Sequence, residues 1–264
     1  MGSLHEGFEI PRSHPRYESL VARERLVEMF EKGVVVPQGL IAHGRGECFD
    51  YLLGEKSHDF ALEAGRATAA YLLLSRRPVI SVNGNYAALA AGEIARLSEV
   101  LGGRAMVEVN IFYRTEERVR RIHEVLESAG VRGLLPPDCE KTRVPGLESP
   151  RGIVCAEGIA SADFVLVAIE DGDRTEALVR WGKRVAAIDL NPFSRTAQKA
   201  SVTIVDEAVR ATRNIAGFVE ELSGASEDRL RSIVEGYNNR EILSRAFRAI
   251  LDRLSSAAES GILT

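Results

Sequence analysis

The chain has 264 residues, of which 45% are hydrophobic, 27% charged and 6% aromatic. That length suits one large α/β domain or two small ones, and we expect a single α/β domain over residues 1–264. The formal net charge is -4, from 38 acidic and 34 basic residues. No global positive field therefore exists to hold a nucleic-acid backbone, and we expect small-molecule partners and no nucleic acid.

The N-terminus and the cysteines indicate the cellular compartment of the protein. Residues 1–17 are charged and broken by prolines, and no apolar run reaches about 18 residues. We therefore expect a cytoplasmic protein with no secretion signal and no membrane span. Cys48, Cys139 and Cys155 are odd in number and lack CxxC spacing, so they predict reduced thiols and not a zinc or redox pair.

Apolar runs alternate with helical patterns along the chain. Ser13 and Pro15 predict the start of an amphipathic helix that ends at Gly33. A glycine-rich loop is expected over residues 39–54, followed by an alanine-rich helix ending near residue 77. Further on, the patterns predict strands at 78–82, 106–112, 164–169, 185–190 and 202–205, and helices at 86–101, 115–129 and 174–182.

Two further segments complete the expected fold. Residues 130–153 are rich in glycine, proline and charge, which is typical of a long irregular connection. Residues 226–258 carry apolar side chains at helical spacing, interrupted near 236–239, and predict two helices. Apolar strands alternating with helices favour a Rossmann-like, mostly parallel sheet with helices on both faces, an N-terminal helical segment over about 1–56 and the C-terminal helices.

Polar clusters follow three of the predicted strands. In open parallel sheets, ligands bind beyond the carboxyl ends of the strands, where helix N-termini present backbone donors. We expect the second and third clusters to share one edge, because they follow neighbouring strands. The three clusters are Asn83-Gly84-Asn85, then Glu170-Asp171-Gly172-Asp173-Arg174-Thr175, and Asp189-Leu190-Asn191-Pro192-Phe193-Ser194-Arg195-Thr196.

Each cluster has a structural and a functional interpretation. Asn83 and Asn85 beside a glycine form a turn as readily as a site, since Asn and Gly accept positive φ. The carboxylates and arginine at 170–175 suit magnesium-nucleotide or ribose binding better than ordinary capping, for which one Asp suffices. The set at 189–196 can hydrogen-bond a ribose or phosphate, and a capped turn with a surface arginine is the alternative.

The glycine-flanked segment from His43 to Glu47 is a fourth candidate. Glycines on both sides of Arg45 allow close ligand approach, and its guanidinium suits a phosphate. His43 is either a catalyst or a structural hydrogen-bonding residue. Arg16 and Arg23, seven residues apart on one helical face, are either solvated or directed at one anion site. GxxxxGK[ST] and GxGxxG are both absent, which argues against a P-loop or dinucleotide fingerprint.

Several sequence blocks together resemble one known family. The blocks are IPRSHPRYESLVARERLV, GLIAHGRGE with FDYLLGE, PVISVNGN, EVNIFYRTEER, EDGDRTEALV and IDLNPFSRTA. In this order, over residues 10–213, they look like the archaeal phosphopantothenate synthetases, which are 4-phosphopantoate:beta-alanine ligases. Phe193, where an aliphatic residue is usual, and Cys48, where a small one is usual, depart from the family pattern without touching the expected chemistry.

The resemblance implies a homodimeric enzyme of coenzyme A biosynthesis with ATP, 4-phosphopantoate and beta-alanine as its substrates. Such an enzyme forms an acyl adenylate and releases AMP, diphosphate and 4′-phosphopantothenate. Magnesium would accompany the ATP, with no metal ligands assigned. With the clusters above, the resemblance assigns nucleotide binding to Arg23, Arg45, Asp171, Gly172, Asp173, Arg174, Thr175, Asp189, Asn191, Pro192, Ser194 and Arg195. The catalytic candidates are Arg45, His43, Asn83 and Asn85, with Asn110 beside them.

Two other classes of protein stay open at this point. One is an NAD(P)-dependent oxidoreductase on a similar sheet, and the absence of GxGxxG counts against it. The other is a nucleotide-binding regulatory protein without turnover. The dense arginine, histidine and carboxylate content of several separate loops counts against that class, because a sensor needs fewer reactive polar groups.

Overall fold

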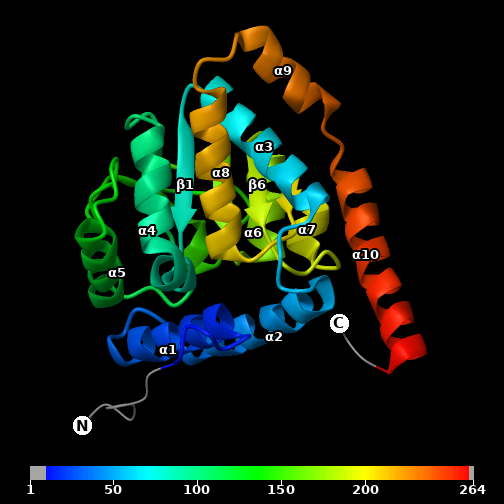
Figure 1. Ribbon diagram of the computed structural model, residues 1–264. Coiled ribbons are helices and arrows are strands. Elements are labelled where there is room, and N and C mark those ends of the chain that lie inside the picture. Colours follow the sequence, from blue (N-terminus) through cyan, green and yellow to red (C-terminus); the bar gives the residue numbers. More distant parts are fainter. Residues whose placement is uncertain (1–9, 262–264) are drawn as a thin grey trace.

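A parallel sheet forms the centre of the fold. The computed structural model describes residues 10–261, in which five parallel strands in the order β2-β1-β5-β6-β7 carry helices on both faces (Figure 1). The predicted α/β class with its mostly parallel sheet is confirmed. The strands are β1 (Pro78–Val82), β2 (Met106–Val109), β5 (Phe164–Ala168), β6 (Arg184–Ile188) and β7 (Val202–Ile204).

Side chains of each strand alternate between two apolar layers. Ile80 and Leu166 belong to a core shared with α3, α4 and α8, whereas Val79 and Val165 face the opposite layer with Leu178 of α6. Burial on both faces explains why these strands read as continuous apolar runs in the sequence. The helices are α3 (Asp59–Leu74), α4 (Gly84–Val100), α6 (Gly172–Arg180) and α8 (Ala208–Leu222).

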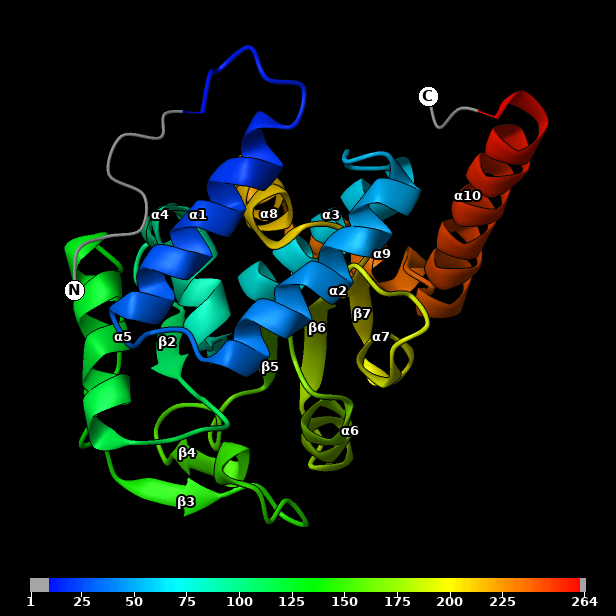
Figure 2. The ribbon, with the colours of Figure 1, turned by 90° about the horizontal axis from the view of Figure 1, so that it is seen from below.

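Two N-terminal helices lie across the carboxyl edge of the sheet, as both views show (Figures 1 and 2). They are α1 (Tyr17–Glu31) and α2 (Pro37–Leu53). The predicted helix start at Ser13 and Pro15 is wrong, because α1 begins at Tyr17 and its cap residue Arg16 makes no side-chain capping bond. These two helices therefore cover the edge of the sheet where ligands are expected to bind.

The glycine-rich loop predicted for residues 39–54 is also wrong, because this segment is helix α2. Pro37 stands in the first turn, and Gly54 ends the helix in the left-handed conformation with φ of 80°. One of its glycines, Gly39, is favoured by a close tertiary contact. A Cβ at Gly39 would lie only 2.2 Å from Oδ1 of Asn85. Close packing on the sheet thus outweighs the low helix propensity of glycine.

The connection that was predicted to be irregular contains a small hairpin. Strands β3 and β4 pair in antiparallel fashion, in a second sheet beside the main one. Three-residue strands are too short to produce a readable alternation in the sequence. The elements between β2 and β5 are α5 (Glu116–Ser128), β3 (Lys141–Arg143), the 3-10 helix η1 (Pro150–Gly152) and β4 (Ile153–Cys155).

The hairpin brings two cysteines together. Cys139 and Cys155 form a disulfide, with their Cα atoms 5.7 Å apart and a sequence separation of 16. The prediction of three reduced thiols is therefore wrong for this pair, because chain reversal at the hairpin supplies a proximity that sequence spacing does not show. Cys48 is a free, exposed cysteine.

The C-terminal segment forms two helices, as predicted. The second of them, α10, stands at the side of the molecule and packs against α2, α3 and β7 (Figure 1). None of the helices within residues 10–261 combines the length and apolarity needed to cross a bilayer. The elements after β6 are α7 (Arg195–Lys199), α9 (Glu227–Gly236) and α10 (Asn239–Ser260), with β7 and α8 before α9.

The strand order places a ligand crevice at one point of the sheet. Counting the five strands of the large sheet along the chain, their spatial order is 2-1-3-4-5. Helix α4 leaves β1 towards one face, and α6 leaves β5 towards the other. In doubly wound sheets the crevice between two such strands is the usual ligand site. Here that point lies between β1 and β5.

Candidate functional site

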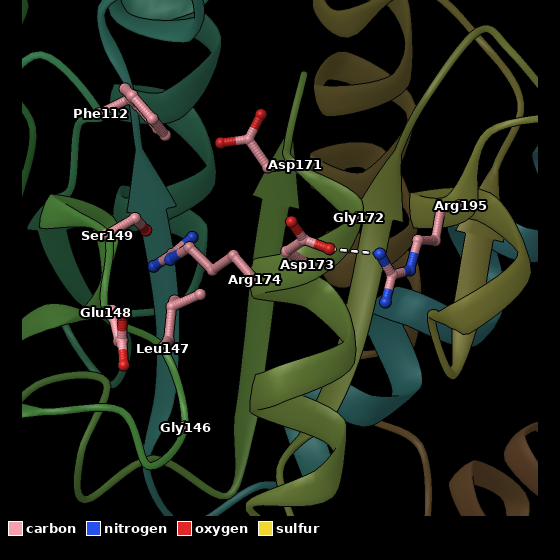
Figure 3. A pocket seen from close by; sticks show the side chains of 10 residues that line it. All are labelled: Phe112, Gly146, Leu147, Glu148, Ser149, Asp171, Gly172, Asp173, Arg174 and Arg195. Atoms are coloured by element: carbon pink, nitrogen blue, oxygen red, sulfur yellow. Dashed lines mark hydrogen bonds and ion pairs between the residues drawn. The ribbon is translucent and has the colours of Figure 1, made fainter.

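A cavity of about 570 Å³ opens beside this point, within the size range of small-molecule sites. Its walls come from the start of α6, the segment before η1, the loop after β2 and the start of α7 (Figure 3). Segments far apart in sequence thus meet around one space. The residues that line it are Phe112, Gly146, Leu147, Glu148, Ser149, Asp171, Gly172, Asp173, Arg174 and Arg195.

The N-terminus of α6 faces the cavity. Asp171 stands at the cap position without a side-chain capping bond, and the first amides of a helix lack acceptors within the helix. Gly172 allows α7 to approach closely, because a Cβ there would lie 2.6 Å from Cβ of Arg195. The arrangement suits an anionic group such as a phosphate. Thr175, also predicted to bind nucleotide, is buried, and its Oγ1 has no hydrogen-bond partner among the described residues.

A buried ion network supports this helix start. Nη2 of Arg151 lies 2.8 Å from Oε1 of Glu170, and Arg174 pairs with the other carboxylate oxygen. The side chains of Arg151, Glu170 and Arg174 are 6%, 1% and 1% exposed. Arg174 also donates to Oγ of Ser81, 3.1 Å away. Burial lowers the pKa of Arg174, and the Glu170 carboxylate opposes that shift.

This network determines the contacts of two arginines near the cavity, Arg174 and Arg151. Arg174, predicted to bind nucleotide, lines the cavity, but its guanidinium is engaged by Glu170 and Ser81. Arg151 was not singled out from the sequence, where it stands in a proline- and glycine-rich stretch with no strand or helix pattern. It also donates to the backbone carbonyl of Asn110 at 2.8 Å and lies 3.3 Å from Asp171.

Strain is concentrated at the end of β5. Ile169 has φ of 52°, a left-handed conformation that is rare for a β-branched residue and costs on the order of 1–3 kcal/mol. The amide of Asn83 holds this turn, donating to the carbonyls of Ala168 at 2.7 Å and Ile169 at 3.2 Å. Backbone strain of this kind clusters at ligand sites. Here it lies directly before the residues that enter the cavity.

The structure gives both asparagines after β1 positioning contacts. Asn83 also caps α4, accepting from the amide of Tyr86 at 3.0 Å. Nδ2 of Asn85 donates to the carbonyl of Gly39 at 2.8 Å and so fastens α2 to the sheet edge. A Cβ at Gly84 would lie 2.4 Å from the carbonyl of Val34. The catalytic role expected for Asn83 and Asn85 stays a prediction.

Local hydrogen bonds shape the loop after β6. Asp189 accepts from the amide of Asn191 at 2.9 Å and from Oγ of Ser194, which in turn caps α7 by accepting from Ala197 at 2.9 Å. Pro192 is buried beside them. Burial raises the pKa of Asp189, while the bonds from Ser194 and Asn191 and the charge of Arg45 act against that rise. These groups hold the loop in one shape.

The clusters after β5 and β6 meet at one edge, as predicted from their neighbouring strands. Arg195 forms ion pairs with Asp173 and Glu176, and Figure 3 shows the pair with Asp173 spanning the space between α6 and α7. Thr196 donates to the carbonyl of Glu170 at 2.8 Å. The proposed nucleotide segments are therefore joined by direct contacts.

Helix α2 brings the predicted Arg45 and His43 to the same edge. Arg45 is exposed, and its charge acts on Asp189. A Cβ at Gly46 would lie 3.9 Å from Cδ1 of Leu190, so this turn of α2 sits over the loop after β6. Burial lowers the pKa of His43, and its Nε2 has no hydrogen-bond partner within the part of the chain that the structure describes.

Arg16 at the cap of α1 and Arg23 within it converge on a carboxylate of α2. Nη2 of Arg23 lies 2.9 Å from Oε2 of Glu47, and Nη2 of Arg16 lies 3.2 Å from Oε1. Arg16 and Arg23 thus reach the same carboxylate, although Arg16 precedes the helix and does not lie on its face. Burial alone would raise the pKa of Glu47, but hydrogen bonds from Arg23 and Ser19 outweigh it and the pKa is lowered. The nucleotide contact expected of Arg23 stays a prediction.

Comparison with known proteins gives similarity along nearly the whole chain. A family model described as phosphopantothenate/pantothenate synthetase matches residues 60–253. The 4-phosphopantoate--beta-alanine ligase of Thermococcus kodakarensis is 50% identical over 257 residues, covering 96% of both chains. The ligase of the same name from Methanosarcina mazei is 46% identical over 254 residues, covering 96% of this chain and 99% of the relative. That of Methanospirillum hungatei is 47% identical over 245 residues, covering 93% and 98%.

The buried network predicts a large cost for neutralising Glu170. Glu170→Gln leaves the guanidinium groups of Arg151 and Arg174 buried without their carboxylate, and should lower the free energy of unfolding by about 3 kcal/mol or more. Glu227→Gln is the matched control, since the Glu227–Arg231 pair is 67% and 58% exposed and should change the free energy of unfolding far less. Urea unfolding measures both, and equal effects would contradict the network's importance.

The lowered pKa of His43 predicts an acid-side loss of stability. An unfolded His protonates near pH 6.5. Below that pH the unfolded chain binds a proton that folded His43 does not, so stability falls as the pH drops, by at most about 1.4 kcal/mol per pH unit. His43→Gln should therefore show a shallower decrease between about pH 7 and 5.5 in urea unfolding. His123, whose pKa is also lowered by burial, supplies part of the remaining slope. Identical slopes in both proteins would refute the shift.

Proposed function

Because the chain belongs to the phosphopantothenate/pantothenate synthetase family, we propose that it joins 4-phosphopantoate to beta-alanine. The products are 4′-phosphopantothenate, AMP and diphosphate, and ATP supplies the energy. The observation that carries this proposal is identity of 46–50% to relatives named 4-phosphopantoate--beta-alanine ligase over at least 93% of this chain. The same finding favours a ligase of coenzyme A biosynthesis over an oxidoreductase or a regulatory nucleotide-binding protein.

The geometry at the carboxyl edge is consistent with two anionic substrates. The start of α6 presents backbone amides to the cavity, and the start of α7 contributes Arg195. Arg45 lies above the loop after β6, which contains Asp189 and Asn191. We assign the loop after β6 and the start of α6 to ATP, because they offer carboxylate and amide groups for ribose and backbone donors for phosphate.

The proposed reaction has two steps. A carboxylate oxygen of 4-phosphopantoate attacks the α-phosphorus of ATP, diphosphate leaves, and an acyl adenylate forms. The neutral amine of beta-alanine then attacks the acyl carbon, AMP leaves, and the amine loses a proton. Charge builds up on phosphate oxygens in the first step, so Arg45 and Arg23 act by electrostatic stabilisation in this proposal. His43 and the asparagines after β1 orient the acid or the amine.

We propose that magnesium enters with ATP. No group of three or more His, Cys, Asp or Glu side chains within residues 10–261 forms a metal cluster. Asp171 and Asp173 both line the cavity, and magnesium at nucleotide sites commonly takes only one or two carboxylates while phosphates and water fill the other positions. These two side chains fit that donor set. Bound there, the ion would neutralise triphosphate charge.

We also propose a cytoplasmic homodimer. Apolar side chains lie exposed on the elements at the carboxyl edge, with Ile41 of α2 at 70% and Phe193 of the loop before α7 at 58% exposure. Exposed apolar groups gathered near one edge are typical of an association surface. Sedimentation equilibrium tests this state directly.

The first experiment is a product assay with ATP, magnesium, 4-phosphopantoate and beta-alanine. We expect AMP and 4′-phosphopantothenate in equal amounts, because adenylation transfers the nucleotide to the acid. Chromatography resolves AMP from ADP, and omission of beta-alanine is the control for uncoupled hydrolysis. Formation of ADP would point to an acyl phosphate, and an absence of acid-dependent nucleotide cleavage would overturn the proposal.

The position of Arg45 predicts a loss of ATP binding on its removal. Arg45→Ala should raise the KM for ATP by roughly tenfold to a hundredfold, the value of a charge-assisted bond to phosphate. Arg120→Ala is the matched control, since Arg120 lies on α5 and pairs with Glu124 at 2.8 Å. Steady-state kinetics at saturating acid and amine give both values. Equal KM values in the two variants would remove Arg45 from the nucleotide site.

A further inference from the structure

One wall of the cavity belongs to a segment closed by a disulfide. Residues 146–149 line the cavity, and the stretch that contains them runs from Cys139 to Cys155 (Figure 3). The disulfide joins the two ends of this stretch, so the wall is a loop with a covalently closed base. We call residues 139–155 the cavity wall segment. Neither cysteine is exposed beyond 8%.

Few regular contacts hold the wall segment in its shape. The β3–β4 ladder pairs only three residues on each side, ending with Lys141 opposite Cys155. A hairpin this small is marginal on its own. The amide of Val144 donates to the carbonyl of Gly152 at 2.8 Å, and buried Val144 and Val154 join the apolar layer. Between them, residues 145, 146, 148 and 150 are exposed while Arg151 and Gly152 are buried, and Gly146 has φ of 72°.

The wall segment also carries a contact on which the rest of the site depends. Arg151 extends from it to Glu170 and Asp171, at the start of the neighbouring helix α6. Asn110 fastens the same part of the segment, donating to the carbonyl of Ile153 at 2.8 Å. A change in the geometry of the segment would therefore move a cavity wall and a buried cation together.

We propose that the Cys139–Cys155 disulfide is a positioning cross-link for substrate binding, which holds the wall segment so that the oxidised protein binds its substrate more tightly than the reduced protein does. This inference rests on the proposed function, because it assigns the substrate to this cavity. Binding to a preorganised wall avoids the cost of ordering a mobile loop at the moment of binding.

The chemistry needs only thiol–disulfide exchange with a dithiol. One thiolate of the dithiol attacks one sulfur of the cystine, which breaks the cystine bond and releases the other cysteine as a thiolate. The second thiolate of the dithiol then attacks the mixed disulfide and displaces the remaining cysteine as a thiolate. The dithiol becomes a disulfide and supplies two electrons, while the two cysteine sulfurs take up two protons. Lys141 lies beside the bond, with Nζ 2.6 Å from Sγ of Cys139 and 3.4 Å from Sγ of Cys155. Its ammonium group would stabilise a cysteine thiolate as a leaving group.

The first test measures thiols and binding on the wild-type chain in both states. Thiol titration of the denatured chain should give one group without reductant, Cys48, and three after treatment with dithiothreitol. Calorimetry then gives Kd for ATP and for 4-phosphopantoate in both states. We expect reduction to raise at least one Kd on the order of threefold to tenfold, and re-oxidation to restore it.

Two variants separate positioning from folding. Cys139→Ser with Cys155→Ser should show the raised Kd and no response to dithiothreitol, while Cys48→Ser should behave as wild type in both states. Trypsin provides a readout that needs no ligand, because Lys141 and Arg143 are exposed within the wall segment. Cleavage there should be faster after reduction, and in the oxidised chain it should leave two pieces joined by the disulfide.

Each outcome bears on one claim. Three thiols in the untreated chain, or Kd values and trypsin rates unchanged on reduction, would overturn the positioning role. A fall in melting temperature with unchanged Kd would show a cross-link that only stabilises the fold, which also overturns it. Binding of both substrates without product formation would overturn the proposed ligase and leave the redox-dependent Kd as a separate result.

Discussion

One buried carboxylate holds the two sides of the cavity together. Glu170 pairs with Arg151 from the wall segment and Arg174 from α6, and Arg174 also reaches Ser81 on β1. Removing guanidinium groups from water costs several kcal/mol for each ion unless a charge and hydrogen bonds compensate. The position of Glu170 therefore fixes where the wall segment and the start of α6 can lie. The start of α6, which lines the cavity, is held in place as a consequence.

The roof over the sheet depends on close backbone contacts. Gly39 and Gly84 lie so near to their neighbours that a Cβ at either position would meet an oxygen at less than 2.5 Å. Asn85 adds a hydrogen bond from the sheet edge to α2. These contacts set the height of α2 above the loop after β6, and with it the position of Arg45.

Three sets of interactions restrict motion around the same crevice. Asn83 holds the left-handed turn at Ile169 after β5, Asp189 and Ser194 define the loop after β6, and a disulfide closes the wall segment. Phosphoryl chemistry gains most from positioning and electrostatics, and both need groups that do not reorganise during reaction. The segments around the crevice are thus held in fixed positions before substrates bind.

The sequence by itself determined the strands, most of the helices and the three polar clusters after β1, β5 and β6. Apolar runs, caps such as Thr115 and turn residues act over a few neighbouring positions, so they are readable locally. Only the tertiary structure decided that residues 37–53 form a helix, that Cys139 meets Cys155, and that Arg174 turns to Glu170 and not to solvent. It also revealed Arg151. These features depend on contacts between segments distant along the chain, whose packing outweighs local propensity and leaves no periodic signal in the sequence.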